Sequence, residues 1–464
     1  MLKKQNIQDS KLWAFSLFGQ CNLGDPRRVK RLVKFAATQA ENPELSISSV
    51  CENESVAEGA YRLLKNEKIK TQQFEEGPFL QVSELCQEQE TVLAIQDTTS
   101  VEITHLPLRK EVQENGLPSG FSVHSTLMVD AQTGIPLGLI DQSRWRQKNN
   151  DIGDKIPTKE KKSAKWQAAS QRMNARLKNP QSVITVCDRE ADIFEFLNYN
   201  CTHENRYIVR CSHNRKSKKN EKLFNEIDNL APVAEKDLTI QQRGPFEEFG
   251  RRREGRKKRT VKLQISSGNV KILRPQDLKE GPKEISVNVV LVREAGNSDG
   301  LVWRIFTSEP VDTPEKAQTI VGHYEKRWLI EDFHKCWKSG CKVEERALQT
   351  IDGLERFMII SSAIAVRILQ LKHLAEACPD LSCEVMFSKA QWRSLHVLSG
   401  NKTPIPQTTP NLKWAYQSIG KLGGFKNSKQ TGKIGWKTLW TGWQKFQDQW
   451  LGWQMAHAHL NVDL

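Results

Sequence analysis

Two short apolar runs constrain the fold of this chain more than any other feature of its sequence. T-V-L-A-I-Q-D spans residues 91–97 and S-V-I-T-V-C-D spans residues 182–188, so each run ends in a carboxylate. Short apolar runs rich in β-branched residues are typical of buried β-strands. The sequence therefore predicts two buried strands that end at Asp97 and Asp188.

The segments around these runs predict a mixed sheet covered by helices. Strands are expected over residues 121–130 and 135–140, on either side of the turn at Thr133 and Gly134, and again over 206–211. Helices are expected over residues 164–177 and directly after Asp188. Early strands followed by helices that alternate with strands indicate an α/β fold.

Residues 231–309 interrupt this alternation. Apolar residues there alternate with polar ones in short segments separated by Gly, Pro and Asn, which predicts an antiparallel β insertion. The basic run G-R-R-R-E-G-R-K-K-R at residues 250–259 is expected to be a loop within it. Helices are expected to resume after Pro310.

The N-terminal region is predicted to be helical and basic. Asp25 suits a helix cap and Pro26 suits the first turn of the helix that follows. Cations cluster on this helix: Arg27, Arg28, Lys30, Arg31 and Lys34. A second helix is expected over residues 55–64. A small basic helical module fits DNA binding, and it fits an ordinary solvated surface equally well.

The C-terminal region combines a long apolar helix, a linker and an aromatic helix. The apolar helix is expected over residues 353–375 and the linker over 400–410. Aromatic residues then recur at three- and four-residue steps: Trp436, Trp440, Trp443, Phe446, Trp450 and Trp453. This spacing places them on one broad helical face. Such regular spacing favours packing, within the chain or between subunits, over base stacking.

The composition points to a polyanionic partner. The chain has 464 residues, enough for two to four domains, with a net charge of +14 and a pI near 9.2. This excess of cations favours nucleic acid over an anionic membrane, although a solvated basic surface would give the same balance. No apolar run of the roughly 20 residues that span a bilayer was predicted, and no signal peptide. The ten cysteines form no C-x-x-C pair, which favours reduced thiols in a cytosolic protein over a zinc site.

One polar stripe is unusual for a helix of a globular protein. Arg327, Glu331 and Lys338 follow Tyr324 at three, seven and fourteen residues. At about 100° per residue these steps return to nearly the same side of a helix. The stripe would carry a phenol, a guanidinium, a carboxylate and an ammonium, which suits a site that holds a metal ion and phosphates.

Glu331 can complete a metal site with the two strand-end carboxylates. Asp97, Asp188 and Glu331 together could hold two divalent cations about 4 Å apart, as in-line phosphodiester chemistry requires. Each aspartate also has a structural interpretation. Asp97 could shape a turn before Thr98, and Asp188 could cap the following helix.

These motifs resemble those of a known family. The pattern Y-x2-R-x3-E-x6-K at residues 324–338 resembles the Y-R-E-K signature of bacterial insertion-sequence transposases of the DDE class, within them most of all the transposon-five type. Further short motifs follow in the family's order along nearly the whole chain: G-D-P-R-R (24–28), E-G-A-Y-R (58–62), D-T-T-S (97–100), V-C-D-R-E-A-D-I (186–193), T-S-E-P-V (307–311), A-V-R-I-L-Q-L (365–371) and L-G-G-F (422–425).

The resemblance implies an RNase H-like catalytic core and cut-and-paste DNA transposition. Asp97, Asp188 and Glu331 would be the metal-binding triad for two Mg²⁺ ions, which Mn²⁺ could replace. A nick would free a 3′ hydroxyl, which forms a hairpin; water would reopen the hairpin, and the freed end would join target DNA. The implied domains are a DNA-end-binding domain (1–85), the core (86–230 and 310–370), the β insertion (231–309) and a dimerisation and synapsis domain (371–464).

The resemblance also implies a set of DNA contacts. Tyr324, Arg327 and Lys338 would contact DNA near the scissile phosphate, with Lys335 as a neighbouring phosphate contact. Trp303 would stack on a flipped base, although a Trp in a strand core is the competing interpretation. Arg27, Arg28 and Arg31 are the candidates for end recognition.

A strand-end contact is expected at Arg210, where the family pattern has a second basic residue two positions on. This chain has Ser212 there, and the residues expected to substitute are Arg215, Lys216, Lys218 and Lys219. The expected partners are transposon ends, target DNA and a second copy of the chain, in the bacterial cytoplasm and without a membrane. The Trp-rich face would meet a partner helix.

Two other functions are compatible with parts of this pattern. A metal-dependent nuclease of the same fold would cleave without joining, but it needs neither an end-recognition module nor a stacking Trp. A DNA-binding repressor descended from a transposase would not need intact Asp97, Asp188 and Glu331.

Overall fold

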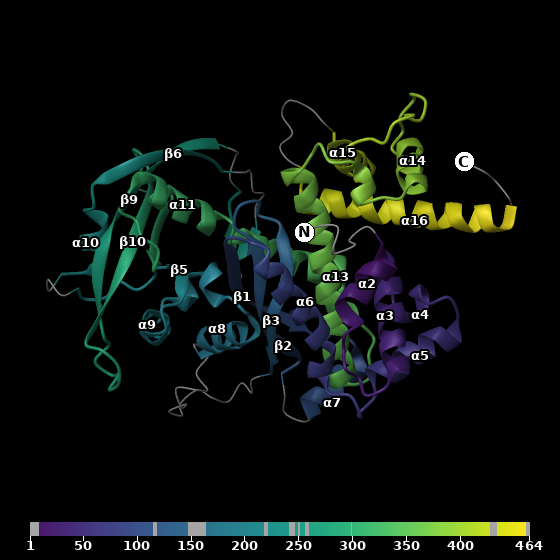
Figure 1. The fold of residues 1–464 in the computed structure, drawn as a ribbon, viewed down its shortest axis with the longest axis horizontal. Coiled ribbons are helices and arrows are strands. Elements are labelled where there is room, and N and C mark those ends of the chain that lie inside the picture. The colour runs from purple at the N-terminus through teal and green to yellow at the C-terminus, as the bar shows by residue number, and fades with distance from the viewer. Residues whose placement is uncertain are drawn as a thin grey trace.

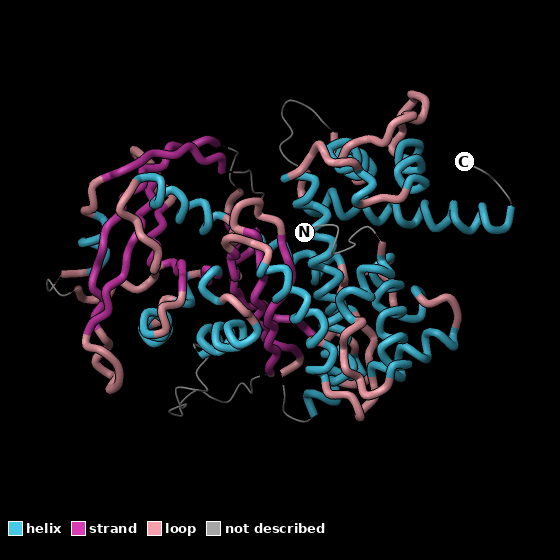
Figure 2. Tube along the Cα trace, in the orientation of Figure 1, coloured by secondary structure: helices cyan, strands magenta, loops and turns pink. Residues whose placement is uncertain are grey.

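The chain contains a nine-stranded mixed sheet that runs from one side of the molecule to its middle, with helical regions on the other side (Figure 1). The structure, a computed structural model, describes residues 9–114, 118–146, 164–217, 221–240, 246–248, 251–255, 259–297, 299–426 and 434–460. The strands follow the order β3-β2-β1-β4-β5-β11-β10-β9-β6 across the sheet. Figure 2 shows the strands gathered in one half of the molecule and helices filling the other half.

The first five strands form the RNase H-like half of the sheet. Their bounds are β1 Val92–Glu102, β2 Gly120–Asp130, β3 Pro136–Trp145, β4 Val183–Cys187 and β5 Arg206–Arg210. Strands β3, β2 and β1 are antiparallel neighbours, whereas β1, β4 and β5 run parallel. Helices α7 (Leu106–Glu114), α8 (Ala164–Arg176) and α9 (Phe194–Thr202) belong to this half. The predicted mixed α/β architecture is confirmed.

Strand β1 is longer than its apolar run. The sequence placed Asp97 at the strand end, but β1 continues to Glu102, which pairs with Gly120 of β2. The antiparallel ladder with β2 carries the strand onward after its apolar residues stop, because backbone pairing satisfies polar residues as well as apolar ones. Asp97 therefore lies in the middle of β1, and the expectation of a strand end there is wrong.

The β insertion extends the central sheet. Its strands are β6 Pro232–Ile240, β9 Arg259–Leu273, β10 Glu284–Glu294 and β11 Val302–Thr307, preceded by helix α10 Leu223–Asp228. All neighbours within it are antiparallel, as predicted, and β11 pairs with β5. The insertion thus continues the sheet of the core and shares its buried layers.

The basic run at residues 250–259 is partly a strand. Residues Arg251–Arg253 form β8, which pairs with β7 (Phe246–Glu248), and Arg259 begins β9. The backbone register places Glu247 opposite Arg252 and Glu248 opposite Arg251. The expectation of a loop is wrong for these arginines, and residues 249–250 and 256–258 lie outside the described residues.

The N-terminal region is a group of helices that rests on α13 (Ile351–Ala377). Its helices are α2 Ser10–Phe18, α3 Pro26–Glu41, α4 Ile47–Val50, α5 Glu54–Leu64 and α6 Glu76–Gln87. Asp25 caps α3 by accepting a hydrogen bond from the Arg27 backbone N–H at 2.8 Å, and Pro26 occupies the first turn. Both predicted helices are therefore present at the expected places.

The polar stripe does not lie on one continuous helix. Helix α11 (Pro314–Glu325) ends after Tyr324, α12 spans Trp328–Lys335, and a π-helical turn follows over Cys336–Gly340. Tyr324 and Ile330 are both buried, yet six residues on one helix would place them about 120° apart. The break between α11 and α12 lets both side chains reach the core, so the prediction of a single helical face is wrong.

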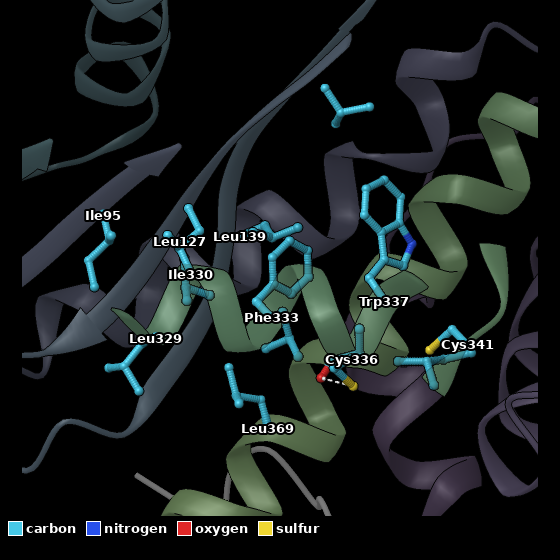
Figure 3. Close-up of a cluster of buried hydrophobic side chains, with 14 of the residues drawn as sticks. Ile95, Leu127, Leu139, Leu329, Ile330, Phe333, Cys336, Trp337, Cys341 and Leu369 are labelled. Atoms are coloured by element: carbon cyan, nitrogen blue, oxygen red, sulfur yellow. Dashed lines mark hydrogen bonds between the residues drawn. The ribbon is translucent and has the colours of Figure 1, made fainter. Parts of the chain in front are cut away.

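Helix α12 is fixed to the sheet by its apolar face. Figure 3 shows Leu329, Ile330 and Phe333 of α12 gathered with Ile95 of β1 and with Leu127, Leu139 and Leu369 from neighbouring elements. The π-helical turn closes with the Cys341 N–H on the Cys336 carbonyl at 2.9 Å. This packing determines where the polar side chains of α12 lie.

Helix α13 forms the buried axis between the helical regions. It has 27 residues, and by length and hydropathy alone it could cross a membrane, a feature that the sequence analysis did not flag. Within the described residues, 83% of its apolar window is buried inside the protein, as in a core helix. Helix α13 also runs through residue 370, the predicted boundary between the catalytic core and the C-terminal domain. That domain boundary stays a prediction.

The aromatic C-terminal helix packs within the chain. Helices α14 (Lys389–Leu398), α15 (Leu412–Leu422) and α16 (Trp436–Leu460) follow α13, and the expected linker over 400–410 has no helix or strand. Trp440, Phe446 and Trp450 of α16 are buried against the rest of the chain. The predicted packing role is confirmed, but the expectation that this face meets a partner helix is wrong for these three residues.

Candidate active site

The structure brings Asp97, Asp188 and Glu331 to one region of the sheet. In the parallel pair of β1 and β4, Ile95 faces Val186. Asp97 lies two residues further along β1, and Asp188 lies two residues after Val186, directly past the end of β4. Helix α12 crosses beside β1 and carries Glu331. Adjacent strands are about 4.8 Å apart, which sets the scale of the separation between the two aspartates.

Arg327 lies among these carboxylates. Its Nη2 donates to Glu331 Oε1 at 2.7 Å, and its Nη1 is 4.0 Å from Asp97 Oδ2. The guanidinium is 9% exposed and also lies over the ring of Trp328, 5.1 Å from the ring centroid. Arg327 therefore neutralises part of the negative charge that the three carboxylates concentrate.

The site resists full ionisation of its acids. Burial raises the pKa of Asp97 to about 6, with the charges of Asp188 and Glu331 adding to the rise, while the Thr98 N–H and Arg327 oppose it. Burial also raises the pKa of Asp188. Buried carboxylates that repel one another are stabilised when a cation lies between them.

The donor set fits hard divalent cations. Carboxylate oxygens are the ligands that Mg²⁺ and Mn²⁺ prefer. Burial raises the pKa of Asp97, and the neighbouring charges of Asp188 and Glu331 add to this rise, so a cation beside Asp97 would be stabilising. Within the described residues, no three His, Cys, Asp or Glu side chains already stand in a metal-binding group. To bind the ions, the three carboxylates would therefore have to move closer together, and the guanidinium of Arg327 would have to move away from them.

Asp188 has the capping role that its sequence position allowed. It follows β4 directly and caps the 3-10 turn Arg189–Ala191 by accepting a hydrogen bond from the Glu190 N–H at 2.8 Å. One oxygen is thereby fixed by the backbone. The capping interpretation is correct and is compatible with a ligand role for the other oxygen.

The aromatic residues near the site differ in exposure. Tyr324 is 4% exposed, and its ring meets that of Trp303 edge-on with 5.4 Å between the centroids. Trp303 is 8% exposed, so most of its surface is covered within the described chain. Trp328, which the sequence analysis did not single out, is 55% exposed and lies directly after Arg327.

The basic residues predicted to contact DNA fall into separate groups. Lys335 is exposed near Asp332, whereas Lys338 forms an ion pair with Glu344 at 3.2 Å. Arg210 is half-buried and donates to the Val302 carbonyl at 3.3 Å. It also lies close enough to Tyr324 to lower the pKa of that phenol, against a larger rise caused by burial.

The N-terminal arginines lie away from the carboxylates. In Figure 1, α3 is separated from β1 by α6 and α13. Arg27 and Arg31 are exposed on α3, and Arg28 donates to the Leu23 carbonyl at 2.8 Å. These residues form a second basic surface, distinct from the candidate active site.

The loop after Arg210 is organised by a buried carboxylate. Asp192 accepts hydrogen bonds from the backbone N–H groups of Ser212 and His213 at 2.7 and 2.8 Å, and pairs with Arg215 at 2.6 Å. Arg215 is paired with Asp192 in this structure, and the expectation that it substitutes as a DNA contact stays a prediction. Lys218 and Lys219 lie outside the described residues.

Two more side chains next to the carboxylates escaped the sequence analysis. Lys165, at the start of α8, lies near enough to Asp188 to lower its pKa, and pairs with Glu190 at 3.2 Å. His334 is three residues after Glu331, and its Nδ1 is 3.9 Å from Asp97 Oδ2. The three-residue spacing from Glu331 could have predicted that His334 lies on the same helical face. The position of Lys165 could not have been predicted in this way, because it depends on tertiary packing.

Comparison with known proteins gives three matches along the chain. Residues 10–69 match the family described as Transposase DNA-binding, residues 132–367 match Transposase DDE domain, and residues 363–459 match Transposase Tn5 dimerisation domain. The DDE match covers just over half of the 464 residues.

One solved structure similar to this chain is described as a cryo-EM structure of the piggyBac transposase synaptic complex with hairpin DNA. The TM-score is 0.38 and the sequence identity 8%, over 81% of this chain and 75% of that chain. The family matches agree with the mixed α/β sheet and its helical flanks. This chain belongs to the transposase DDE family and is a DDE-type transposase related to the Tn5 transposase.

Proposed function

We propose that this transposase performs cut-and-paste DNA transposition, with Asp97, Asp188 and Glu331 as its metal-binding triad. The observation that supports the proposal most is the placement of Asp97 on β1 and of Asp188 directly after the adjacent parallel strand β4, with Glu331 on the helix beside β1 and Arg327 near all three carboxylates. The family depends on a divalent metal ion. We propose two Mg²⁺ ions, which Mn²⁺ can replace.

Each proposed step is an in-line attack of an oxygen on phosphorus. A P–O bond forms to water or to a 3′ hydroxyl, and the opposite P–O bond breaks, so one site serves nicking, hairpin formation, hairpin opening and strand transfer. The bound cations would activate the attacking oxygen and stabilise the departing one. The three carboxylates hold and orient that charge.

Arg327 has a double role in this proposal. Its guanidinium neutralises Glu331 and faces Asp97, and it can turn to a phosphate, whose oxygens it matches in a bidentate fashion. Lys335 and Lys338 would contact neighbouring phosphates of the same strand, Lys338 after exchanging Glu344 for DNA. Tyr324 remains a predicted DNA contact near the scissile phosphate, and it would have to gain exposure beside Trp303.

We propose that an aromatic side chain near the site accepts an unstacked base. Hairpin formation bends the strand sharply, and a base turned out of the helix finds a partner in an aromatic ring. Trp303 remains the predicted partner, beside Arg210, and it would have to gain exposure next to Tyr324. The exposed ring of Trp328 offers a second surface adjoining Arg327.

End recognition and pairing are assigned to the two helical regions. Arg27, Arg28 and Arg31 on α3 would contact the transposon ends, in keeping with the DNA-binding match over residues 10–69. The C-terminal match indicates a dimer, which would pair two ends and capture target DNA. We place the protein in the bacterial cytoplasm, associated with the nucleoid through DNA.

The test uses a labelled duplex that carries the end of the protein's own transposon, a target plasmid, and Mg²⁺ or Mn²⁺. Hairpins and joined products are expected. Cleavage without joining would instead indicate a nuclease, and binding without cleavage a repressor.

The variant Glu331→Ala should abolish all chemistry and leave duplex binding intact, because the change removes one metal ligand. Glu345→Ala is the matched control, since Glu345 is an exposed acid paired with Lys342 outside the site. Cleavage that survived in Glu331→Ala would show that the site assignment is wrong.

A further inference from the structure

His334 is buried against Asp97, but its Nδ1 is too far from that carboxylate for a hydrogen bond. The residue is 8% exposed and lies one turn after Glu331 on α12. Its Nδ1 is 3.9 Å from Asp97 Oδ2, and its Nε2 has no hydrogen-bond partner among the described residues. Buried polar groups without partners are uncommon and call for an explanation.

The two oxygens of Asp97 are held differently. Oδ1 accepts a hydrogen bond from the Thr98 backbone N–H at 2.8 Å. Oδ2 is faced by Arg327 at 4.0 Å and by His334 at 3.9 Å, and neither distance is that of a hydrogen bond. The orientation of Oδ2 is therefore not yet fixed by a direct contact.

We propose that His334 is a positioning residue that donates a hydrogen bond from Nδ1–H to Asp97 Oδ2 and so holds this carboxylate in its metal-binding orientation. The inference rests on the proposed function. An ionised carboxylate can only accept, so the nitrogen that faces it must carry the proton. A closer approach of about 1 Å brings the pair to hydrogen-bond distance.

Arg327 cannot face both Asp97 and a DNA phosphate. When Arg327 turns to a DNA phosphate, Oδ2 loses one of the two donors that face it. His334 remains, because Phe333 and the other apolar residues of α12 anchor the helix to the sheet (Figure 3). A neutral imidazole fixes the oxygen without adding positive charge that would repel a cation. Partners of this kind typically change metal affinity by about 10- to 100-fold when they are removed.

A nearby histidine shows the contrasting, purely structural arrangement. His124 on β2 faces the same strand, with Nδ1 at 2.9 Å from Thr98 Oγ1 and Nε2 at 3.3 Å from Gln96 Oε1. Both of its nitrogens are satisfied by side chains that do not belong to the triad. His334 instead faces only a proposed metal ligand, which favours a role tied to that ligand.

The test measures Mn²⁺ binding to the full-length protein by electron paramagnetic resonance of the free ion, with a thermal melt of every variant. An Asn side chain replaces Nδ1 and a Gln side chain replaces Nε2. His334→Asn should bind Mn²⁺ nearly as the natural protein does, whereas His334→Gln and His334→Leu should bind about 10- to 100-fold more weakly. His396→Leu, a buried histidine of α14 that contacts the Thr403 carbonyl, should leave Mn²⁺ binding unchanged.

The outcomes separate this inference from the proposed function. If Asp97→Asn weakens Mn²⁺ binding and His334→Leu does not, the role of His334 is wrong and the metal site stands. If Asp97→Asn has no effect, the site assignment itself is wrong. Where His334→Leu fails to fold, equal affinities of His334→Asn and His334→Gln would overturn the proposal.

Discussion

At the scale of single residues, the site is a balance between three acids and one guanidinium. Arg327 contacts Glu331 directly and faces Asp97, yet the pKa of Asp97 is still raised to about 6. The folded protein thus holds Asp97 in an environment that disfavours its ionised form. Sites prepared for a cation are commonly less stable without one, since binding energy offsets the repulsion.

The burial of Asp97, together with the charges of Asp188 and Glu331, predicts that Asp97→Asn stabilises the metal-free protein at neutral and higher pH. The folded pKa of about 6 lies above 3.8, the ordinary value for an aspartate, so the folded state binds the proton more tightly than the unfolded state. The contribution of Asp97 is favourable at low pH and is lost as the pH rises through about 6. The gain at pH 8 is at most about 3 kcal/mol, because each tenfold change in proton affinity corresponds to roughly 1.4 kcal/mol.

Thermal denaturation in a metal chelator would measure this gain. The melting temperature of Asp97→Asn should exceed that of the natural protein at pH 8, and the difference should shrink towards pH 4. Asp380→Asn, at an exposed aspartate far along the chain, is the control and should show no such trend. An Asp97→Asn protein that is less stable at pH 8 would contradict the electrostatic account.

At the scale of helices and strands, buried arginines join the N-terminal helices to the core. Arg356 of α13 is 2% exposed and donates to the carbonyls of Leu64, at the end of α5, and Ile69, at 2.5 and 2.6 Å. Arg346 similarly donates to the Pro43 and Leu45 carbonyls after α3. Last-turn carbonyls of a helix lack partners within it, and cations suit that end.

We therefore expect Arg356→Met to loosen the N-terminal helices. Methionine keeps much of the side-chain volume but leaves two buried carbonyls unpaired, at a cost of about 2–4 kcal/mol. The melting temperature should fall, and hydrogen exchange should rise in α5 before it rises in β1. Arg62→Met, at an exposed position of α5, is the matched control and should change neither. Equal exchange in both helices and strands would indicate global instability instead.

Local sequence patterns predicted many of these helices and strands, but they did not predict how some of them pair or connect. Asp25 and Pro26 marked the start of α3 because capping is a local interaction. The length of β1 and the pairing of β11 with β5 depend on partner strands far along the chain, which no local pattern encodes. The buried side chains of α11 and α12 would lie on different faces of one continuous helix. The positions of Tyr324 and Ile330 in the sequence already indicated a break between them.

At the scale of the whole molecule, the placement of α16 bears on how two copies associate. Its aromatic face is used inside the chain, where Trp440, Phe446 and Trp450 are buried. In Figure 1 the last turns of α16 extend past the other helices. Two large apolar side chains of that part, Leu451 and Met455, are 43% and 59% exposed. Exposed apolar side chains that lie close together are typical of an interface.

We predict that the double variant Leu451→Lys and Met455→Lys prevents two copies from pairing on DNA without unfolding the chain. Charges in the centre of an apolar interface are costly, whereas at exposed positions of a monomer they cost little. Light scattering of the complex with a transposon-end duplex should show one protein per duplex and no paired complex. Single-end binding and the melting temperature should stay within error of the natural protein.

Gln454→Lys is the matched control, since it adds a cation at an exposed polar position of the same part of α16. It should leave pairing intact. Phe446→Ala, at a fully buried position, should instead lower the melting temperature, because it opens a cavity worth about 3–5 kcal/mol. Paired complexes that persisted in the double lysine variant would place the interface elsewhere on the C-terminal region, and the exposed end of α16 would then have no part in synapsis.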